Sequence, residues 1–141
     1  MGKINLGRVI LGGIVAGIAA DLLDFWVDGV LLAKMWNGQL ETWGRPPFSP
    51  SQITWYLIFG LIIGIVTIWI YAGIRPRFGP GVKTAIYAGI ASWILSALLP
   101  NFALMWNTHF FSGHLTAYTT LGAFFYYLIG AICGAAVYKE A

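Results

Sequence analysis

Four long apolar segments run through this chain, and their length decides what it can fold into. They cover about residues 6–33, 53–74, 84–106 and 115–138. A helix needs roughly 20 residues to cross the hydrocarbon core of a bilayer. Only helices and closed barrels satisfy their backbone hydrogen bonds in lipid, and continuous apolar runs lack the alternation of a barrel strand. We therefore predict an all-α integral membrane bundle of four transmembrane helices, forming a single domain over residues 1–141.

The composition favours the same class of protein. Hydrophobic residues make up 59% of the 141 residues and charged residues only 9%, whereas soluble domains are about 25% charged. Four spans leave no room for a sizeable soluble domain. The net charge of +3 comes from basic residues that flank the apolar segments, which indicates membrane topology and no nucleic-acid partner.

Lysine and arginine are divided unequally between the two ends of the predicted bundle. An even number of spans puts both chain termini on one side of the membrane. Six basic residues fall on that side, and only Lys34 and Arg45 fall on the other. The six are Lys3, Arg8, Arg75, Arg77, Lys83 and Lys139. Because basic loops stay inside, we predict that both termini are cytoplasmic.

The first span carries three aspartates, which is unusual for a membrane segment. Asp21, Asp24 and Asp28 are spaced i, i+3 and i+7, so they share one face of a helix. We call these three residues the acidic stripe. A carboxylate that faces lipid costs about 2.5–3.5 kcal/mol on insertion scales. The stripe is therefore expected to face other helices, water or a partner.

The depth of the stripe suggests binding chemistry. Asp28 approaches the outer end of the span, towards outer segments that carry Glu41, His109 and His114. Three carboxylates this close cannot all ionise cheaply in a low dielectric, so some are expected to hold protons at neutral pH. Asp24 lies too deep for the headgroups and has no basic residue within a span to pair with. The stripe is therefore the candidate ligand or ion site, with the outer residues as contributors.

Structural roles for two of the aspartates remain open. Asp28 would simply reach the lipid headgroups if it lies at the outer interface. Asp21 would bond a neighbouring hydroxyl or cap a helix break. The candidate hydroxyls are Thr67, Ser92, Ser96 and Thr120.

Pairs of glycines recur at four-residue spacing in three of the spans. They are Gly13 with Gly17, Gly60 with Gly64, and Gly130 with Gly134. Such pairs allow helix backbones to approach closely in lipid. The glycines therefore predict a compact bundle, with further contacts available to a homo-oligomer or a larger membrane complex.

Prolines and aromatic residues mark the expected boundaries between spans. The segment from Lys34 to Gln52 is expected to be an outer loop, and Trp36 within it an anchor at the membrane interface. Pro76 and Pro80 are expected to stop the second helix. Pro100 is expected to kink the third helix.

No pattern of a known catalytic site is present. A nucleophile motif, a glycine-rich phosphate loop and a dinucleotide fingerprint are all absent from the sequence. His109 and His114 lie five apart in a loop, without the spacing of metal ligands on a helix, and no span contains a histidine to bind haem. Cys133 is single and lies in an apolar run, where it packs. We expect no catalytic residue, no resident metal and no cofactor.

Two segments, LGRVILGGIVAGI and YAGIRPRFGPGVKTA, resemble a loose group of small, uncharacterised bacterial four-span integral membrane proteins. The resemblance covers about a third of the chain. It implies a multi-pass protein of the bacterial inner membrane and brings no catalytic residues. In that group the position of Asp24 is acidic, whereas those of Asp21 and Asp28 are amides. This chain is more acidic, which argues against a mechanism that needs all three carboxylates.

Three hypotheses about function follow, and the lipid bilayer is the partner common to all. The first is a non-enzymatic membrane protein whose acidic stripe docks a partner subunit or a ligand. The second is a carrier or channel in which Asp24, with Asp21 and Asp28, binds a proton or cation. The third is a metal-dependent membrane enzyme that uses the outer histidines. Carboxylates buried in a helix serve binding and conduction equally well, so the sequence does not separate the first two.

Overall fold

The computed structural model describes residues 3–140, without the side chain of Trp106, and contains no strand within them. Four of its helices are long and apolar enough to cross a membrane. They run over Leu6–Leu31, Pro50–Phe78, Val82–Met105 and Gly113–Val137. The all-α class and the number of apolar helices predicted from the sequence are thus confirmed, with ends that differ by a few residues.

Two of these helices change from α-helical to π-helical hydrogen bonding along their length. The first consists of α1 (Leu6–Asp24) and a π-helical segment, Phe25–Leu31. The third consists of α4 (Val82–Trp93), a π-helical segment (Ile94–Leu98), α5 (Leu99–Phe102) and a second π-helical segment (Ala103–Asn107). The others are α2 (Ala33–Thr42), α3 (Pro50–Phe78) and α6 (Gly113–Val137).

Local chemistry fixes where the long helices begin. Asn5 accepts a hydrogen bond from the backbone N–H of Arg8 and caps α1. Ser49 and Gln52 form a reciprocal capping box ahead of Pro50, which needs no intrahelical partner at the first position of α3. Ser112 caps α6. Each cap satisfies an N–H group that the first turn of a helix leaves free.

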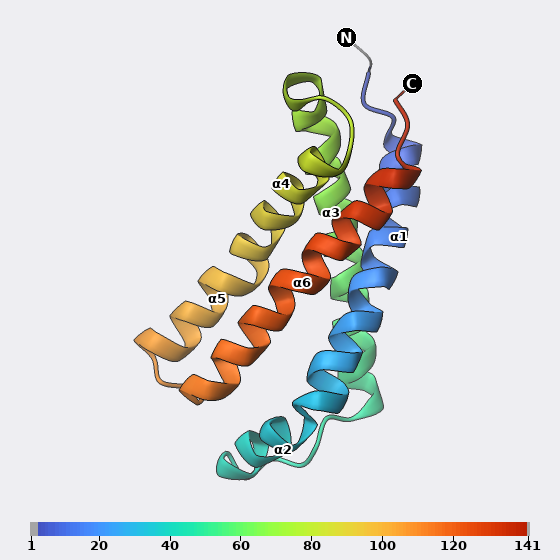
Figure 1. Cartoon of the computed structure of the whole chain (residues 1–141). Helices are drawn as coiled ribbons and strands as arrows, with labels where there is room; N and C mark the ends of the chain where they lie inside the picture. The colour runs from blue at the N-terminus through green and yellow to red at the C-terminus, as the bar shows by residue number, and fades with distance from the viewer. Residues whose placement is uncertain (1–2, 141) are drawn as a thin grey trace.

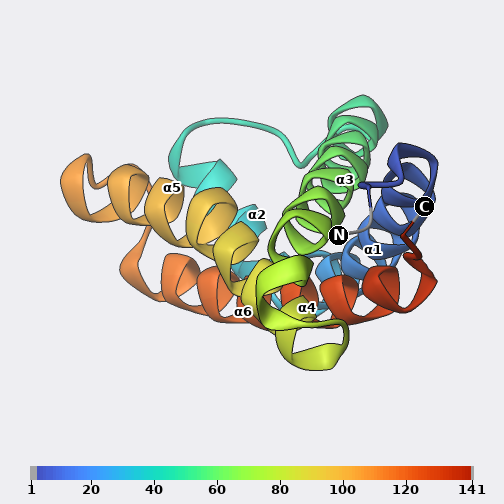
Figure 2. The same cartoon turned by 90° about the horizontal axis from the view of Figure 1, so that it is seen from above.

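The helices pack closely at one end of the molecule and spread apart at the other. Both termini and the α3–α4 turn lie at one end, which we call the terminal end, and α2 lies at the opposite end (Figure 1). Helix α1 packs between α3 and α6, and α4 packs on α6 and on α3. Seen from above, α5 lies away from α3, and the chain between α2 and α3 crosses the gap (Figure 2).

Glycines bring α1 and α3 into backbone contact. A Cβ on Gly17 would lie 2.7 Å from Cα of Leu61, and one on Gly64 would lie 2.8 Å from Cα of Gly17. Gly13 lies equally close to the backbone of α3, at Ile65. Only glycine fits such an approach, as expected for helices packed by small residues.

The contact between α1 and α6 is made in the same way. A Cβ on Gly130 would lie 2.7 Å from the carbonyl oxygen of Ala16, and Gly134 lies against Gly12 and Ala16. Nearby, the hydroxyls of Thr67 and Ser92 lie 2.7 Å apart and satisfy each other between α3 and α4. These contacts concentrate the tightly packed core towards the terminal end.

The expected outer loop is partly helical. The segment Lys34–Gln52 was predicted to lack helix, but α2 occupies its first part and ends before Gly44, which has a φ of 65°. Helix α2 is short and its composition is polar on average, so it does not resemble a membrane span. Its aromatic residues pack against the turn before α6, where Trp43 lies 4.6 Å from Phe110 between ring centroids.

One expectation about prolines is corrected. Helix α3 does not stop at Pro76 but continues to Phe78 and ends at Gly79, whose φ is 82°. Pro76 lies two residues before the end of α3. Its missing N–H therefore removes only one backbone hydrogen bond from the last turns of the helix. Around Pro100, the helix continues through π-helical hydrogen bonds on both sides. Proline has no backbone N–H to donate. In the two segments beside it, N–H groups bond to the carbonyl five residues back in place of the carbonyl four residues back.

Candidate functional site

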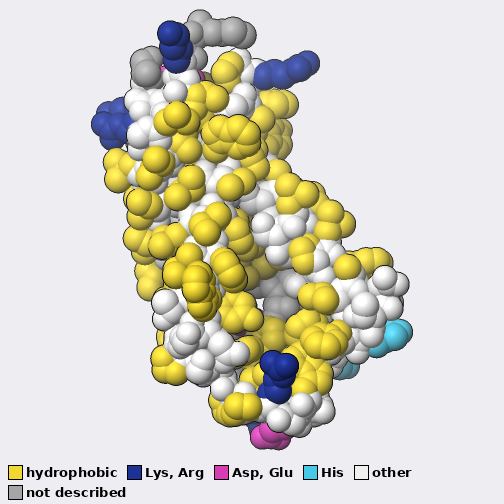
Figure 3. Space-filling model, turned by 180° about the vertical axis from the view of Figure 1, so that it is seen from behind, with side chains coloured by type: hydrophobic (Ala, Val, Ile, Leu, Met, Phe, Trp, Pro, Cys, Tyr) yellow, Lys and Arg dark blue, Asp and Glu magenta, His cyan; other side chains and the backbone are white. Residues whose placement is uncertain are grey.

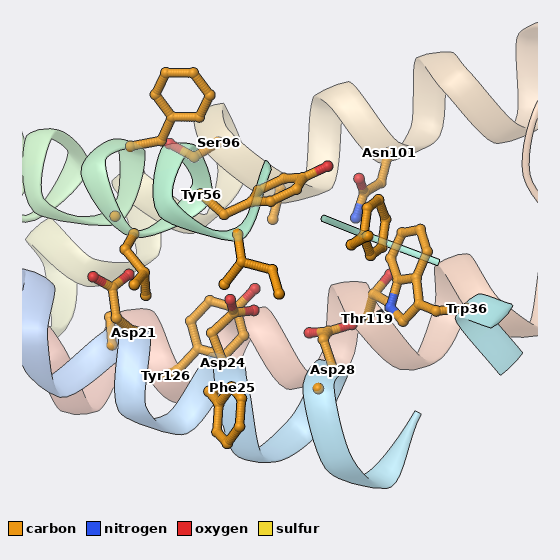
Figure 4. Close-up of a pocket in the computed structure, with 18 of the residues that line it drawn as sticks. Asp21, Asp24, Phe25, Asp28, Trp36, Tyr56, Ser96, Asn101, Thr119 and Tyr126 are labelled. Carbon is orange, nitrogen blue, oxygen red and sulfur yellow. Dashed lines mark hydrogen bonds between the residues drawn. The ribbon is translucent and has the colours of Figure 1, made fainter. Parts of the chain in front are cut away.

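A cavity of about 640 Å³ lies between the helices in the half of the molecule that carries α2. Its walls come from α1, α3, α5, α6 and the segment from α2 to α3. All three residues of the acidic stripe line it, as the close-up shows (Figure 4). The structure therefore brings Asp21, Asp24 and Asp28 to one cavity between the helices.

Asp24 lies in the middle of the stripe and has two polar neighbours. The hydroxyl of Tyr126, from α6, lies beside its carboxyl group, and the carboxyl of Asp28 follows about one turn further along the same helix (Figure 4). Tyr127, the next residue of α6, also lines the cavity beside the stripe.

Asp28 is fixed by a residue from α2. The indole N–H of Trp36 donates a hydrogen bond of 2.9 Å to Oδ1 of Asp28. The ring of Trp36 packs edge-on against Phe48 and Phe111, each at 5.8 Å between centroids. Trp36 thus belongs to the wall of the site. It also gives Asp28 a bonded protein partner.

Asp21 occupies space that a glycine leaves open. A Cβ added to Gly60 of α3 would overlap the carboxyl group of Asp21. Three of the four hydroxyls considered as its partners are engaged elsewhere: Thr67 and Ser92 bond each other, and Thr120 accepts from Asn101. The fourth, Ser96, lines the same cavity. Gly60 is therefore both a helix-packing residue and part of the site.

The π-helical segment positions the outer half of the stripe. It begins directly after Asp24 and contains Asp28. Its last hydrogen bond runs from the N–H of Leu32 to the carbonyl of Val27, 2.8 Å away and five residues back. This wider turn is rare in proteins and occurs frequently at functional sites. It ends the first long helix at Leu31, and α2 begins at Ala33 and lines the cavity.

The rest of the lining is aromatic and apolar, with a few neutral polar groups. Phe25, Tyr56 and Phe111 contribute rings from different elements. Ser96 and Asn101 face the cavity from the third long helix (Figure 4). No lysine or arginine is among the described residues that line it. The stripe therefore has no basic counter-charge in the cavity.

The expected outer contributors lie elsewhere. Glu41, His109 and His114 are exposed, and none of them lines the cavity. Across residues 3–140, no group of three or more histidine, cysteine, aspartate or glutamate side chains has the arrangement of a metal site. The structure thus separates the histidines from the acidic stripe.

Sequence reasoning missed Tyr126 and Tyr127. Neither residue was assigned a role from the sequence. The available signal was two adjacent hydroxyl-bearing rings in the middle of an otherwise apolar span, where a tyrosine hydroxyl needs a partner. The sequence offered no way to assign that partner to Asp24.

No protein-family model, curated protein or solved structure matches the chain. The functional argument therefore depends on the geometry of the cavity.

Proposed function

We propose that this chain is a multi-pass membrane protein that binds a cationic ligand in the cavity of its acidic stripe. The observation that carries the proposal is that three carboxyl groups line one cavity whose described lining contains no lysine or arginine. Acidic groups at membrane depth are costly and typically mark an ion or substrate site. A cation in the cavity would provide the missing counter-charge.

The same geometry favours a ligand over a partner subunit. A docking stripe for another protein would lie on the outside of the bundle, where a second helix could reach it. Here α3, α5, α6 and α2 surround the stripe. A small molecule can occupy this space, whereas a helix of about 10 Å diameter would have to displace the existing walls.

Transport of the bound cation is the second candidate function. The cavity lies towards the end that carries α2, and the glycine contacts of α1 with α3 and α6 close the bundle towards the terminal end. A carrier that is open to one side only has this arrangement, because alternating access moves helices around a central site. The same carboxyl groups would then bind the cation before and after the movement.

We place the protein in the bacterial inner membrane with both termini in the cytoplasm. The resemblance of its first span and its Arg75–Lys83 junction to small bacterial membrane proteins supports the compartment. The six basic residues of the terminal end, against Lys34 and Arg45 at the other, support the orientation. The cavity would then lie in the outer half of the membrane.

The first experiment measures thermal unfolding of the purified protein against increasing concentrations of cations. The panel contains Na⁺, K⁺, Mg²⁺, tetramethylammonium and tetraphenylphosphonium, all as chlorides. A ligand that binds only the folded form raises stability with the logarithm of its concentration above its dissociation constant. We expect at least one cation to raise the Tm saturably in the wild type and in Glu41→Gln, which removes an exposed carboxylate, but not in Asp24→Asn.

An unchanged Tm with every cation would contradict the proposed function. So would an equal rise in the wild type and in Asp24→Asn, because the stripe would then play no part in binding. Retention of the folded state by Asp24→Asn is checked by its own unfolding transition without ligand.

A further inference from the structure

We propose that the ligand is a bulky lipophilic organic cation, such as a quaternary ammonium or phosphonium ion with apolar substituents, that enters the cavity from the side between α3 and α5. This inference rests on the proposed function and specifies the chemical class of its ligand. Three features of the cavity carry it: its volume, the spread of its carboxyl groups and the position of its aromatic walls.

The volume is far larger than an inorganic ion requires. A water molecule in the liquid occupies about 30 Å³, and the cavity measures about 640 Å³. Pockets for small organic molecules span roughly 300–1,000 Å³ and are lined mostly by apolar and aromatic side chains. The cavity fits this class in both size and lining.

The carboxyl groups of Asp21 and Asp28 are too far apart for the whole stripe to hold one small ion. From Asp21 to Asp28 the helix rises by about 10 Å, at roughly 1.5 Å per residue. Metal ions bind oxygen ligands at about 2.0–2.6 Å and need six or more of them. A charged group of an elongated organic molecule needs only one carboxylate, and its apolar parts can lie along the rest of the cavity.

Aromatic rings surround the stripe on several sides. Trp36 comes from α2, Tyr56 from α3 and Tyr126 from α6, and Phe25 is the first residue of the π-helical segment that follows α1 (Figure 4). Rings attract cations over their faces, and cages of such rings recognise quaternary ammonium groups. A lipophilic cation would contact both the carboxylates and the rings. An inorganic ion would have to give up its hydration water next to apolar side chains that cannot replace it.

The cavity is open on the flank where α3 and α5 diverge. Leu57 and Phe59 of α3 and Leu104 beyond α5 line the cavity and are also 42%, 51% and 42% exposed. The space-filling view from behind shows a hollow on this flank, between surfaces covered with hydrophobic side chains (Figure 3). In a bilayer this opening faces hydrocarbon, which a lipophilic cation can cross and a hydrated metal ion cannot.

Equilibrium binding to the full chain in lipid nanodiscs tests the inference. The probe is tetraphenylphosphonium, and the matched control ligand is triphenylphosphine oxide, which has similar rings but no charge. We expect saturable binding of tetraphenylphosphonium and no saturable binding of the neutral oxide. Affinity should fall at least tenfold in Asp24→Asn and in Asp28→Asn, which remove charge at two independent positions.

An aromatic variant tests the ring contacts separately. Tyr56→Leu removes a ring from the cavity at a half-exposed position, and Tyr56→Phe keeps the ring. We expect at least a tenfold loss of tetraphenylphosphonium affinity in the first variant and little change in the second. Trp69→Leu, at an exposed position of the same helix that does not line the cavity, is the control.

The outcomes separate this inference from the proposed function. If Na⁺, K⁺ or Mg²⁺ raises the Tm through Asp24 but tetraphenylphosphonium does not bind, the protein binds a cation and the inference about its class is wrong. If the neutral oxide binds as tightly as the phosphonium, the inference is also wrong, because charge is not recognised. If no cation binds in either experiment, both are wrong.

Discussion

The three aspartates of the acidic stripe have different surroundings although they share one helix face. Asp28 accepts a hydrogen bond from Trp36, and Asp24 faces the hydroxyl of Tyr126. Asp21 has neither kind of partner and lies against Gly60. Substitutions at the three positions are therefore expected to have different consequences, and each can be tested through its own neighbour.

The contact between Asp21 and Gly60 predicts strong coupling between these positions. Gly60→Ala places a methyl group where the carboxyl of Asp21 lies, and overpacking of this kind costs about 1–3 kcal/mol. In an Asp21→Ala background the space is free, and alanine in a helix is worth about 0.5–1 kcal/mol more than glycine. We expect Gly60→Ala to destabilise the wild type and to stabilise Asp21→Ala, measured by thermal unfolding of the four proteins in a double-mutant cycle. Equal effects in both backgrounds would refute the contact.

The hydrogen bond from Trp36 to Asp28 predicts local stability in α2. Trp36→Phe keeps an aromatic ring but removes the N–H group, and a hydrogen bond to a charged group contributes about 1.5–3 kcal/mol. We expect amide hydrogen exchange throughout α2 to accelerate by roughly tenfold or more if the helix opens locally. Trp43→Phe is the matched control, because the ring of Trp43 packs in the same aromatic cluster. Similar exchange rates in both variants would contradict a role for this bond.

At the residue scale, the sequence predicted the inward face of the stripe but not its partners. The i, i+3, i+7 spacing and the cost of charge in lipid were sufficient to place Asp21, Asp24 and Asp28 on one protected face. The partners Trp36, Tyr126 and Gly60 come from three other elements. Which residues of different helices meet depends on helix rotation and depth, and neither is encoded in the spacing within one span.

At the scale of elements, α1 is the helix around which the others assemble. One side of it contacts α3 through Gly13 and Gly17, and another contacts α6 at Gly12 and Ala16. The polar stripe continues from the α3-facing side towards the cavity. The same helix therefore supplies close backbone packing in its first half and the candidate binding groups in its second.

Backbone contact between α1 and α3 predicts that Gly64 cannot carry a side chain. In Gly64→Ala the new Cβ would collide with the backbone of Gly13 and Gly17, so the two helices must move apart. We expect a loss of about 1–3 kcal/mol in unfolding free energy. Gly73→Ala is the control on the same helix, because nothing lies within 4 Å of its new Cβ, and it should be neutral or slightly stabilising. Comparable thermal stability of the two variants would contradict the packing.

The apolar helices could be predicted well, and the short α2 could not. Runs of apolar residues longer than a bilayer requires leave helix as the only solution for each span. Helix α2 is ten residues long, too short to be stable alone. It is held by contacts with distant residues: Gln39 accepts a hydrogen bond of 2.9 Å from the N–H of Ser112. Tertiary contacts of this kind leave no periodic signal in the sequence.

At the scale of the whole molecule, tight packing and basic charge coincide at one end and the cavity lies at the other. Arg75 illustrates the terminal end: it forms an ion pair of 3.3 Å with Glu140 and lies 5.6 Å from the ring centre of Tyr138. These contacts connect α3 to the C-terminal segment. The movement that a carrier would need is therefore expected to begin at the opposite end, where fewer side chains are buried.

The proposed orientation predicts which end of the bundle can be labelled from outside a cell. In a Cys133→Ala background, single cysteines are placed at Arg45, near α2, and at Lys83, in the first turn of α4. We expect a membrane-impermeant maleimide to label Arg45→Cys in intact spheroplasts and Lys83→Cys only after the membrane is opened. The reverse pattern would invert the topology and place the cavity in the inner half of the membrane.

The unequal spread of the helices also affects the lipids around them. A bundle that is narrow at the terminal end and wide at the α2 end displaces more area in one leaflet than in the other (Figure 1). Closing the gap between α3 and α5 would reduce the cross-sectional area of the protein in that leaflet. Lateral pressure in that leaflet therefore shifts the equilibrium between the open and the closed bundle, as a ligand does. Each favours the conformation with which it has the lower free energy. The lipid composition of the leaflet around the α2 end would in this way affect how often the site is open.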